Sequence, residues 1–184
     1  KREKYRDVYF YTFFVSINYF CTFALMNETV KVYSVDEAKL KLEAYCAYQE
    51  RCHREVVEKL RKMRMIPLAI DEIVVHLIKN GYLNEERYAK SYARGKFRIK
   101  KWGRVRIERE LKMKGLSSYI IDAALEELDE DEYASVFDDI AERKYNSIKE
   151  KNPYKARAKL VNYLLYRGWE SDLVYEKASE LYDI

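Results

Sequence analysis

Residues 106–128 read RIERELKMKGLSSYIIDAALEEL, and two other stretches of the chain share the pattern of this segment. They are EVVEKLRKMRMIPLAIDEIVVHL at residues 55–77 and ARAKLVNYLLYRGWESDLVYEKASEL at residues 156–181. In each stretch the last apolar positions fall four and then three residues apart, which places them on one face of a helix. The chain therefore contains three copies of one helical unit.

The aligned copies predict a helix, a tight turn and a second helix in each unit. Gly115 and Gly168 follow the first helix at the same position, where glycine adopts a left-handed backbone conformation without strain. Arg64 occupies this position in the first unit, so its turn is expected to differ. The aligned columns are Leu60, Leu111 and Leu164; Arg64, Gly115 and Gly168; Met65, Leu116 and Trp169; Ile70, Ile121 and Val174; Val74, Leu125 and Ala178; and Leu77, Leu128 and Leu181.

A further helix is expected before each unit, which makes three helices per unit. Ser117 and Ser171 are expected to cap the helices after the turns, and Pro67 suits a first helical turn. The third unit has eight additional residues between its marker pair and its aligned leucine, and we expect them around residues 149–154. The marker pairs of the preceding helices are Glu37-Ala38, Tyr88-Ala89 and Tyr133-Ala134.

The composition also favours helices with few breaks. Only five of the 184 residues are glycine and two are proline, whereas an all-β chain needs a turn roughly every ten residues. We predict an all-α fold, a tandem array of three three-helix repeats that is elongated and curved; one irregular helical bundle is the alternative. The expected divisions are an N-terminal extension (1–35), repeat 1 (36–80), repeat 2 (81–128) and repeat 3 (129–184).

The N-terminal stretch differs in character from the rest of the chain. Residues 8–25 carry no charge and follow a basic segment at residues 1–7. This combination is compatible with a membrane anchor, and a structured extension is a third interpretation. The stretch is rich in Phe and Tyr and poor in Leu and Ala, and its residues have A/T-rich codons. We therefore favour translated upstream DNA, with Met26 as the native start.

Positive charge concentrates in the second repeat. Residues 87–114 hold twelve Lys or Arg against two Glu, a net charge of +10. On the helix expected over Glu85–Lys101, the side chains of Tyr88, Tyr92 and Ile99 share one face and five cations share the other. Because like charges on one face repel each other, a polyanion-binding surface is favoured over a merely solvated face. The predicted binding residues are the basic stripe, formed by Arg87, Lys90, Arg94, Arg98 and Lys101, and the cations of the next helix, Arg104, Arg106, Arg109 and Lys112.

Negative charge concentrates directly after this region. Residues 122–142 hold ten Asp or Glu and no basic residue. This acidic block is compatible with pairing to the basic helices within the fold, with pairing between molecules, and with a solvated acidic helix. Base-specific reading of nucleic acid is not expected, because the stripe lacks the Asn and Gln side chains of a recognition helix.

No catalytic or cofactor motif occurs in the sequence. The five glycines are scattered and form no phosphate-binding loop, and the carboxylates form a continuous charged run instead of an isolated pair. Cys46, Cys52, His53 and His76 lack the paired spacing of a zinc site. The three unpaired cysteines suit a reducing compartment. We therefore expect a protein that is not an enzyme and has no metal and no cofactor.

Three stretches in combination resemble the RecX family. Residues 81–96, GYLNEERYAKSYARGK, resemble the family's stretch built on Tyr-Leu-Asn-Asp, an Arg and an aromatic-Ala pair. Residues 101–116, KWGRVRIERELKMKGL, resemble its Gly-Pro-Arg-Arg-Ile, Glu-Leu and Lys-Gly-Ile stretch, and residues 45–60 occupy the place of its Arg-Ser-Glu-Leu opening. The likeness covers residues 36–182 and agrees with the three-repeat layout.

The chain departs from the family pattern at a few positions. Glu85 replaces the usual Asp, and Val105 stands where a basic residue is common. In the first repeat, Cys52-His53 replaces small residues, so the resemblance says less about the role of this repeat than about that of the second.

The resemblance implies a regulator of the RecA recombinase. RecX-like proteins lie in the groove of the RecA–DNA filament and modulate, usually inhibit, strand exchange and ATP hydrolysis, which regulates DNA repair and the SOS response. The expected partners are the RecA filament and, weakly and without sequence preference, single- and double-stranded DNA. The protein is expected to be a cytoplasmic monomer without membrane contact. The alternatives are a generic nucleic-acid-binding helical protein and, if residues 8–25 are native, a membrane-anchored helical adaptor.

Overall fold

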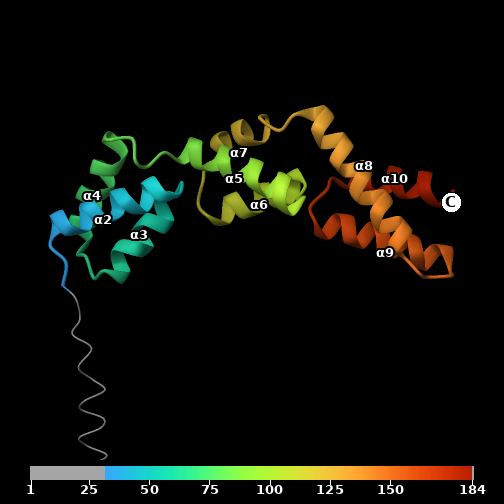
Figure 1. Ribbon diagram of the computed structural model, residues 1–184, viewed down its shortest axis with the longest axis horizontal. Coiled ribbons are helices and arrows are strands. Elements are labelled where there is room, and N and C mark those ends of the chain that lie inside the picture. The colour runs from blue at the N-terminus through green and yellow to red at the C-terminus, as the bar shows by residue number, and fades with distance from the viewer. Residues whose placement is uncertain (1–31, 184) are drawn as a thin grey trace, which may run out of the picture. The chain divides into compact units, whose positions relative to one another are not determined.

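The computed structural model describes residues 32–183, which form helices and no strand. The helices follow one another in three triplets (Figure 1), which confirms the predicted all-α repeat array. The predictions about Met26 and residues 8–25 fall outside the described residues. The first triplet contains α2 (Val35–Tyr48), α3 (His53–Lys62) and α4 (Pro67–Lys79); the second α5 (Glu85–Lys100), α6 (Arg104–Met113) and α7 (Ser118–Leu125); the third α8 (Glu130–Ser147), α9 (Pro153–Tyr166) and α10 (Ser171–Tyr182).

The same turn joins the second and third helices of every triplet. Its left-handed residue has φ of 60° at Arg64, 87° at Gly115 and 81° at Gly168. The prediction that Arg64 makes a different turn is therefore wrong, because the turn's hydrogen bonds offset a conformational cost of about 1–2 kcal/mol. In each turn the next residue donates its N–H to the aligned leucine: Met65 to Leu60 at 3.1 Å, Leu116 to Leu111 at 3.3 Å and Trp169 to Leu164 at 3.3 Å.

The predicted helix starts are confirmed at two of three positions. The side chain of Ser117 accepts the backbone N–H three residues on, and Pro67 lies in the first turn of α4. The prediction that Ser171 caps α10 is wrong by one residue, because Glu170 holds the cap position. Glu170 makes no side-chain cap; its carboxylate instead accepts a hydrogen bond from Tyr133 at 2.7 Å.

The third triplet is longer mainly because its helices are longer. α8 has 18 residues and α9 has 14, compared with 16 in α5 and 10 in α6. The prediction that the extra residues lie around 149–154 is thus only partly right. The third marker pair is also misaligned, because Ala134 is exposed whereas Ala38 and Ala89 are fully buried.

The second and third triplets share one apolar core. Phe97, Tyr133 and Trp169 stack at its centre, with ring centroids 5.5 Å apart between the first two and 4.6 Å apart between the last two. Cys52 is the one described residue of the first triplet that belongs to this core, and the other buried side chains of that triplet lie outside it. The first triplet therefore has a core of its own.

Two glycines bring the second and third triplets into backbone contact. Gly103 donates its N–H to Arg167 O at 3.0 Å, and Val105 donates its N–H to Gly168 O at 3.1 Å. A Cβ on Gly103 would lie 2.6 Å from the Cα of Trp169 and closer still to Gly168. Because real Cβ atoms do not approach backbone so closely, only glycine fits at this contact.

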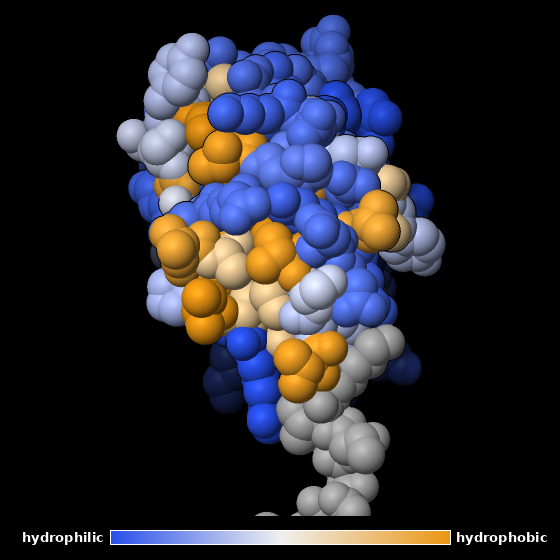
Figure 2. Space-filling model, turned by 90° about the vertical axis from the view of Figure 1, so that its left-hand side faces the viewer, coloured by the Kyte–Doolittle hydropathy of each residue, from blue (hydrophilic) through white to orange (hydrophobic). Residues whose placement is uncertain are grey.

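The first triplet exposes apolar side chains on its outer surface, where Figure 2 shows them gathered. Leu68, Val75 and Ile78 of α4 are 76 %, 48 % and 54 % exposed, and Leu40 of α2 is 67 % exposed. The opposite face of α4 is buried in the core of the triplet. α4 is therefore apolar on two sides.

Candidate polyanion-binding surface

The basic stripe lies beside the buried face of α5, not opposite to it. The buried face consists of Ala89, Ala93 and Phe97, along with Tyr88. The face expected to hold Tyr88, Tyr92 and Ile99 is only partly buried, because α5 packs on α7 through its alanine face and Ile99 is 77 % exposed. A stripe next to a buried face lies within reach of the neighbouring helices.

Four of the five stripe cations form ion pairs with carboxylates of other parts of the chain. The carboxylate of Glu127 bonds Lys90 and Arg94, and these contacts lower the pKa of Glu127 and raise that of Lys90. The stripe is therefore largely neutralised within the fold. The pairs are Arg87–Glu50 at 2.5 Å, Lys90–Glu86 and Lys90–Glu127 at 2.8 Å, and Arg94–Glu127 and Arg98–Glu132 at 2.9 Å.

The cations of α6 divide into paired and unpaired groups. Arg104 pairs with Glu130 at 2.6 Å and stacks its guanidinium on the ring of Tyr133 at 4.0 Å. Lys112 pairs with Glu108 one turn earlier. The side chain of Arg109 is exposed and forms no hydrogen bond or ion pair with a described residue. Glu127, Glu130 and Glu132 thus show that part of the acidic block pairs with basic helices within the fold.

A second group of cations has no carboxylate partner among residues 32–183. It lies where the end of α5 meets α6 and the turn between α9 and α10. Two of its members, Lys101 and Arg106, are predicted binding residues, and the other three fall outside the helical stripe. We call this group the basic cluster, and its members are Lys96, Lys100, Lys101, Arg106 and Arg167.

Aromatic rings and backbone carbonyls hold the basic cluster in place. The Lys96 ammonium lies 5.1 Å from the ring of Trp102, and the Arg106 guanidinium lies 4.1 Å from the same ring. Arg106 also donates to Tyr166 O at 3.0 Å, and Arg167 donates to Lys100 O at 2.6 Å. These contacts are worth about 1 kcal/mol each and leave the positive charge uncompensated, so the cluster can attract an anion.

Lys101 owes its place in the cluster to the end of α5. The helix stops at Lys100, and Lys101 is its left-handed cap with φ of 55°. The prediction that Lys101 continues the helical stripe is therefore wrong. Its N–H donates to Phe97 O at 2.9 Å.

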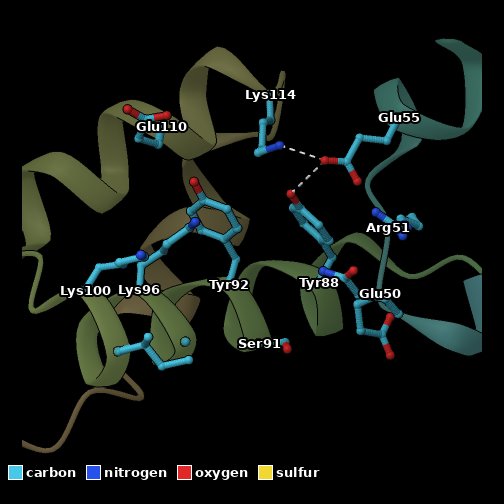
Figure 3. Close-up of a pocket in the computed structure, with 13 residues that line it drawn as sticks. Glu50, Arg51, Glu55, Tyr88, Ser91, Tyr92, Lys96, Lys100, Glu110 and Lys114 are labelled. Carbon is cyan, nitrogen blue, oxygen red and sulfur yellow. Dashed lines mark hydrogen bonds and ion pairs between the residues drawn. The ribbon is translucent and has the colours of Figure 1, made fainter.

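A cleft of about 590 Å³ separates the first triplet from α5 and α6 (Figure 3). Lys96 and Lys100 line one side of it, and Glu55 lies on the other. Glu55 bonds Lys114 at 2.7 Å and Tyr88 at 3.4 Å. Burial disfavours the charge on Lys114, but its hydrogen bonds to Glu55 and Tyr88 outweigh burial and raise the lysine's pKa.

Two of the described cysteines are packed inside the fold, and one of the described histidines is paired with a carboxylate. Cys46 and Cys52 are buried thiols, and burial raises the pKa of both. His76 pairs with Glu43 at 2.6 Å, and His53 is exposed at the start of α3. No group of three potential metal ligands comes together within residues 32–183. Among the described helices none is long and apolar enough to cross a membrane.

Comparison with known proteins gives the family. The family model described as RecX, second three-helix domain, matches residues 84–125, and the model of the third domain matches residues 130–177. The crystal structure of RecX from Lactobacillus salivarius superposes with a TM-score of 0.71 at 26 % identity, over 82 % of this chain and 97 % of that one. A second crystal structure, of regulatory protein RecX, superposes with a TM-score of 0.68 at 22 % identity, over 79 % and 73 % of the two chains.

Curated relatives agree with these matches. The chain is 29 % identical over 147 residues to the regulatory protein RecX of Bacillus cytotoxicus, covering 80 % of this chain and 54 % of that protein. It is 29 % identical over 149 residues to that of Bacillus mycoides, covering 81 % and 55 %. The chain thus spans about half the length of these relatives. Its helical triplets, its family-model matches and its structural neighbours together show that the chain belongs to the RecX family.

Proposed function

We propose that the chain is a regulator that binds the RecA–DNA filament and lowers its recombinase and ATPase activity. Membership of a family whose curated members are called regulatory proteins supports a regulatory role without catalysis. The partner and the direction of regulation rest on what the resemblance implies. The same proposal includes that the protein is a cytoplasmic monomer, that it needs neither metal nor cofactor, and that it regulates DNA repair.

The observation that carries this proposal is the uncompensated charge of the basic cluster. Cations paired with carboxylates gain little from an approaching phosphate, because the anion must compete with a bonded partner. Lys96, Lys100 and Lys101 have no such competitor among the described residues. We therefore assign the contact with the filament to the basic cluster and to Arg109, which follows Arg106 by one helical turn, and not to the paired part of the stripe.

The rings of the cluster favour contact with phosphates over contact with bases. Lys96 and Arg106 already lie over the ring of Trp102, so this ring is not free to stack on a base. Binding to free DNA should thus be weak, salt-sensitive and nearly independent of sequence. A generic nucleic-acid-binding protein without a recombinase partner is the alternative function.

The test compares two triple variants of equal net charge. The cluster variant is Lys96→Gln, Lys100→Gln and Lys101→Gln, and the stripe variant is Lys90→Gln, Arg94→Gln and Arg98→Gln. The cluster variant should inhibit ATP hydrolysis by RecA filaments less than the unmodified protein does. For free DNA, its slope of log affinity against log salt should flatten by about 2, because each phosphate contact contributes roughly 0.7–0.9. The stripe variant should keep most of the inhibition and most of the salt slope of the unmodified protein.

The two variants also separate the candidate functions. A filament regulator keeps its inhibition when free DNA is in large excess, because its site exists only on the assembled filament. A generic binder loses inhibition under that condition. Equal losses in both variants would assign the effect to overall charge and not to the basic cluster. Inhibition that follows the free DNA concentration alone would overturn the regulator proposal.

A further inference from the structure

The two junctions between the helix triplets are built from different chemistry. The junction of the second and third triplets has an apolar core, with aromatic rings packed around Trp169 and backbone hydrogen bonds through Gly103 and Gly168, and ion pairs such as Arg98–Glu132 lie outside this core. Separating it exposes apolar surface, at about 25 cal/mol for each Å². These two triplets are therefore expected to move as one body.

The junction of the first and second triplets is mostly polar. It consists of Glu55 bonded to Lys114 and Tyr88, Arg87 bonded to Glu50, and Arg54 donating to Met113 O at 2.7 Å. Cys52 is the one apolar side chain of the first triplet within the shared core. Water can replace partly exposed ion pairs of this kind, which are typically worth less than about 1 kcal/mol each.

The cleft beside this polar junction provides room for movement. Its open space of about 590 Å³ lies between the loop before α3 and the facing side chains of α5 and α6 (Figure 3). On the α5 side, the small residues Ser91 and Gly95 line the cleft between larger side chains such as Tyr92. The covalent link is the connection of residues 80–84, in which Gly81 has φ of 72°.

We propose that the first triplet turns as a rigid arm about Cys52, and that the contacts of Glu55 with Lys114 and Tyr88 act as a latch on this movement. Opening the latch widens the cleft and leaves the body of the second and third triplets unchanged. Because Lys96 and Lys100 line the same cleft, the position of the arm sets how far these two cluster lysines are accessible. The movement itself does not depend on the proposed binding to the filament.

The test measures distances within the full chain by spin labels on introduced cysteines. The labelled positions are exposed: Lys62→Cys in α3, Ser118→Cys in α7 and Asn162→Cys in α9, in a Cys21→Ser background that keeps the buried thiols Cys46 and Cys52. The distance distribution across the polar junction, between positions 62 and 118, should be broader than that across the junction with the apolar core, between positions 118 and 162.

The latch is tested with Lys114→Gln and a matched control. Lys114→Gln should broaden the 62–118 distribution further, and so should high salt, because salt screens partly exposed charges. The control Lys159→Gln removes a pair of nearly the same length, Lys159–Glu150 at 2.8 Å, which joins α9 to the loop before it within the third triplet. It should leave both distributions unchanged.

Three outcomes contradict the proposal. A 62–118 distribution as narrow as the 118–162 distribution would show that the first triplet is fixed. A 62–118 distribution that changes neither with Lys114→Gln nor with salt would show that the latch contacts do not restrain the movement. A 118–162 distribution that broadens together with the 62–118 distribution would show that the second and third triplets do not move as one body. Since no RecA or DNA is present in these measurements, each outcome is independent of the proposed function.

Discussion

Replacing Gly103 by alanine should destabilise the protein through steric overlap alone. Gly103 has φ of −76°, which alanine adopts freely, so the backbone conformation is not the obstacle. The new Cβ would lie 2.5 Å from the carbonyl carbon of Gly168 and 2.6 Å from the Cα of Trp169. Both are backbone atoms, so the two turns must move apart.

The loss of stability follows from the hydrogen bonds and packing contacts that this movement breaks. The hydrogen bonds Gly103 N–H to Arg167 O and Val105 N–H to Gly168 O are each worth about 1 kcal/mol. Shifting the packing around Trp169 adds about 1–3 kcal/mol. The expected loss is therefore about 3–5 kcal/mol in the free energy of unfolding, and the melting temperature should fall by roughly 6–20 °C for a domain of this size.

Gly95→Ala is the matched control for this variant. Gly95 lies inside α5, and a Cβ there meets nothing within 4 Å. Alanine should therefore stabilise the helix by about 0.5–1 kcal/mol. The assay is thermal unfolding followed by circular dichroism at one protein concentration. A Gly103→Ala melting temperature equal to that of the unmodified protein, or a fall as large in Gly95→Ala, would refute the argument from backbone contact.

Two further predictions concern the chain start and alkaline pH. A chain of residues 26–184 should be as helical and as stable as the full chain if Met26 is the native start; circular dichroism and thermal melting test this, and a loss of folding contradicts it. Burial raises the pKa of Tyr88 and Tyr133 above the ordinary value of about 10, so the folded state holds these protons more tightly and stability should fall as pH rises above about 10. Absorbance at alkaline pH should therefore show part of the tyrosine ionising only as helical dichroism is lost, and complete ionisation of a still helical protein would contradict this.

The repeat pattern predicts the fold well because turns and cores are local and periodic. The columns that contain Leu111 and Ile121 are buried as expected, and the turn geometry recurs in all three triplets. The expectation for Arg64 fails because the preference for glycine at a left-handed position is only an average conformational cost. At Arg64 the hydrogen bonds of the turn offset this cost. The pairing of Glu170 with Tyr133, at the start of α10, depends on tertiary contacts that no local pattern contains.

The candidate site is predicted less well because a helical wheel contains only one helix. It places Lys90, Arg94 and Arg98 together correctly, but it cannot show which carboxylates approach from other helices. The helical wheel also leaves Lys96 and Lys100 out of the predicted site, because they lie off the stripe. It cannot include Arg167, which belongs to another triplet. The cluster forms only because the glycine contact brings the turn after α9 against the end of α5.

The repeat itself nevertheless contains information about charge pairing. Three side-chain pairs join the first helix of a triplet to its third helix, or to the turn after that helix, at the same separation. The pairs Lys39–Glu72, Glu43–His76 and Arg94–Glu127 are each 33 residues apart. Once the repeats are aligned, a search for opposite charges at this separation identifies the stripe residue Arg94 as paired from the sequence alone.

The same search leaves the lysines of the basic cluster uncompensated. The residues 33 positions after Lys100 and Lys101 are a tyrosine and an alanine, which carry no negative charge at neutral pH. The residue 33 positions after Lys96 is Asp129, whose carboxylate accepts the backbone N–H of Glu132 as the cap of α8. An acidic residue that is followed by a helix start is thus better assigned to the helix cap than to an ion pair. In this chain, a basic residue is therefore a better candidate for a binding surface once the ion pairs at the repeat's own pairing distance, and pairs such as Lys90–Glu127 at other distances, have been subtracted.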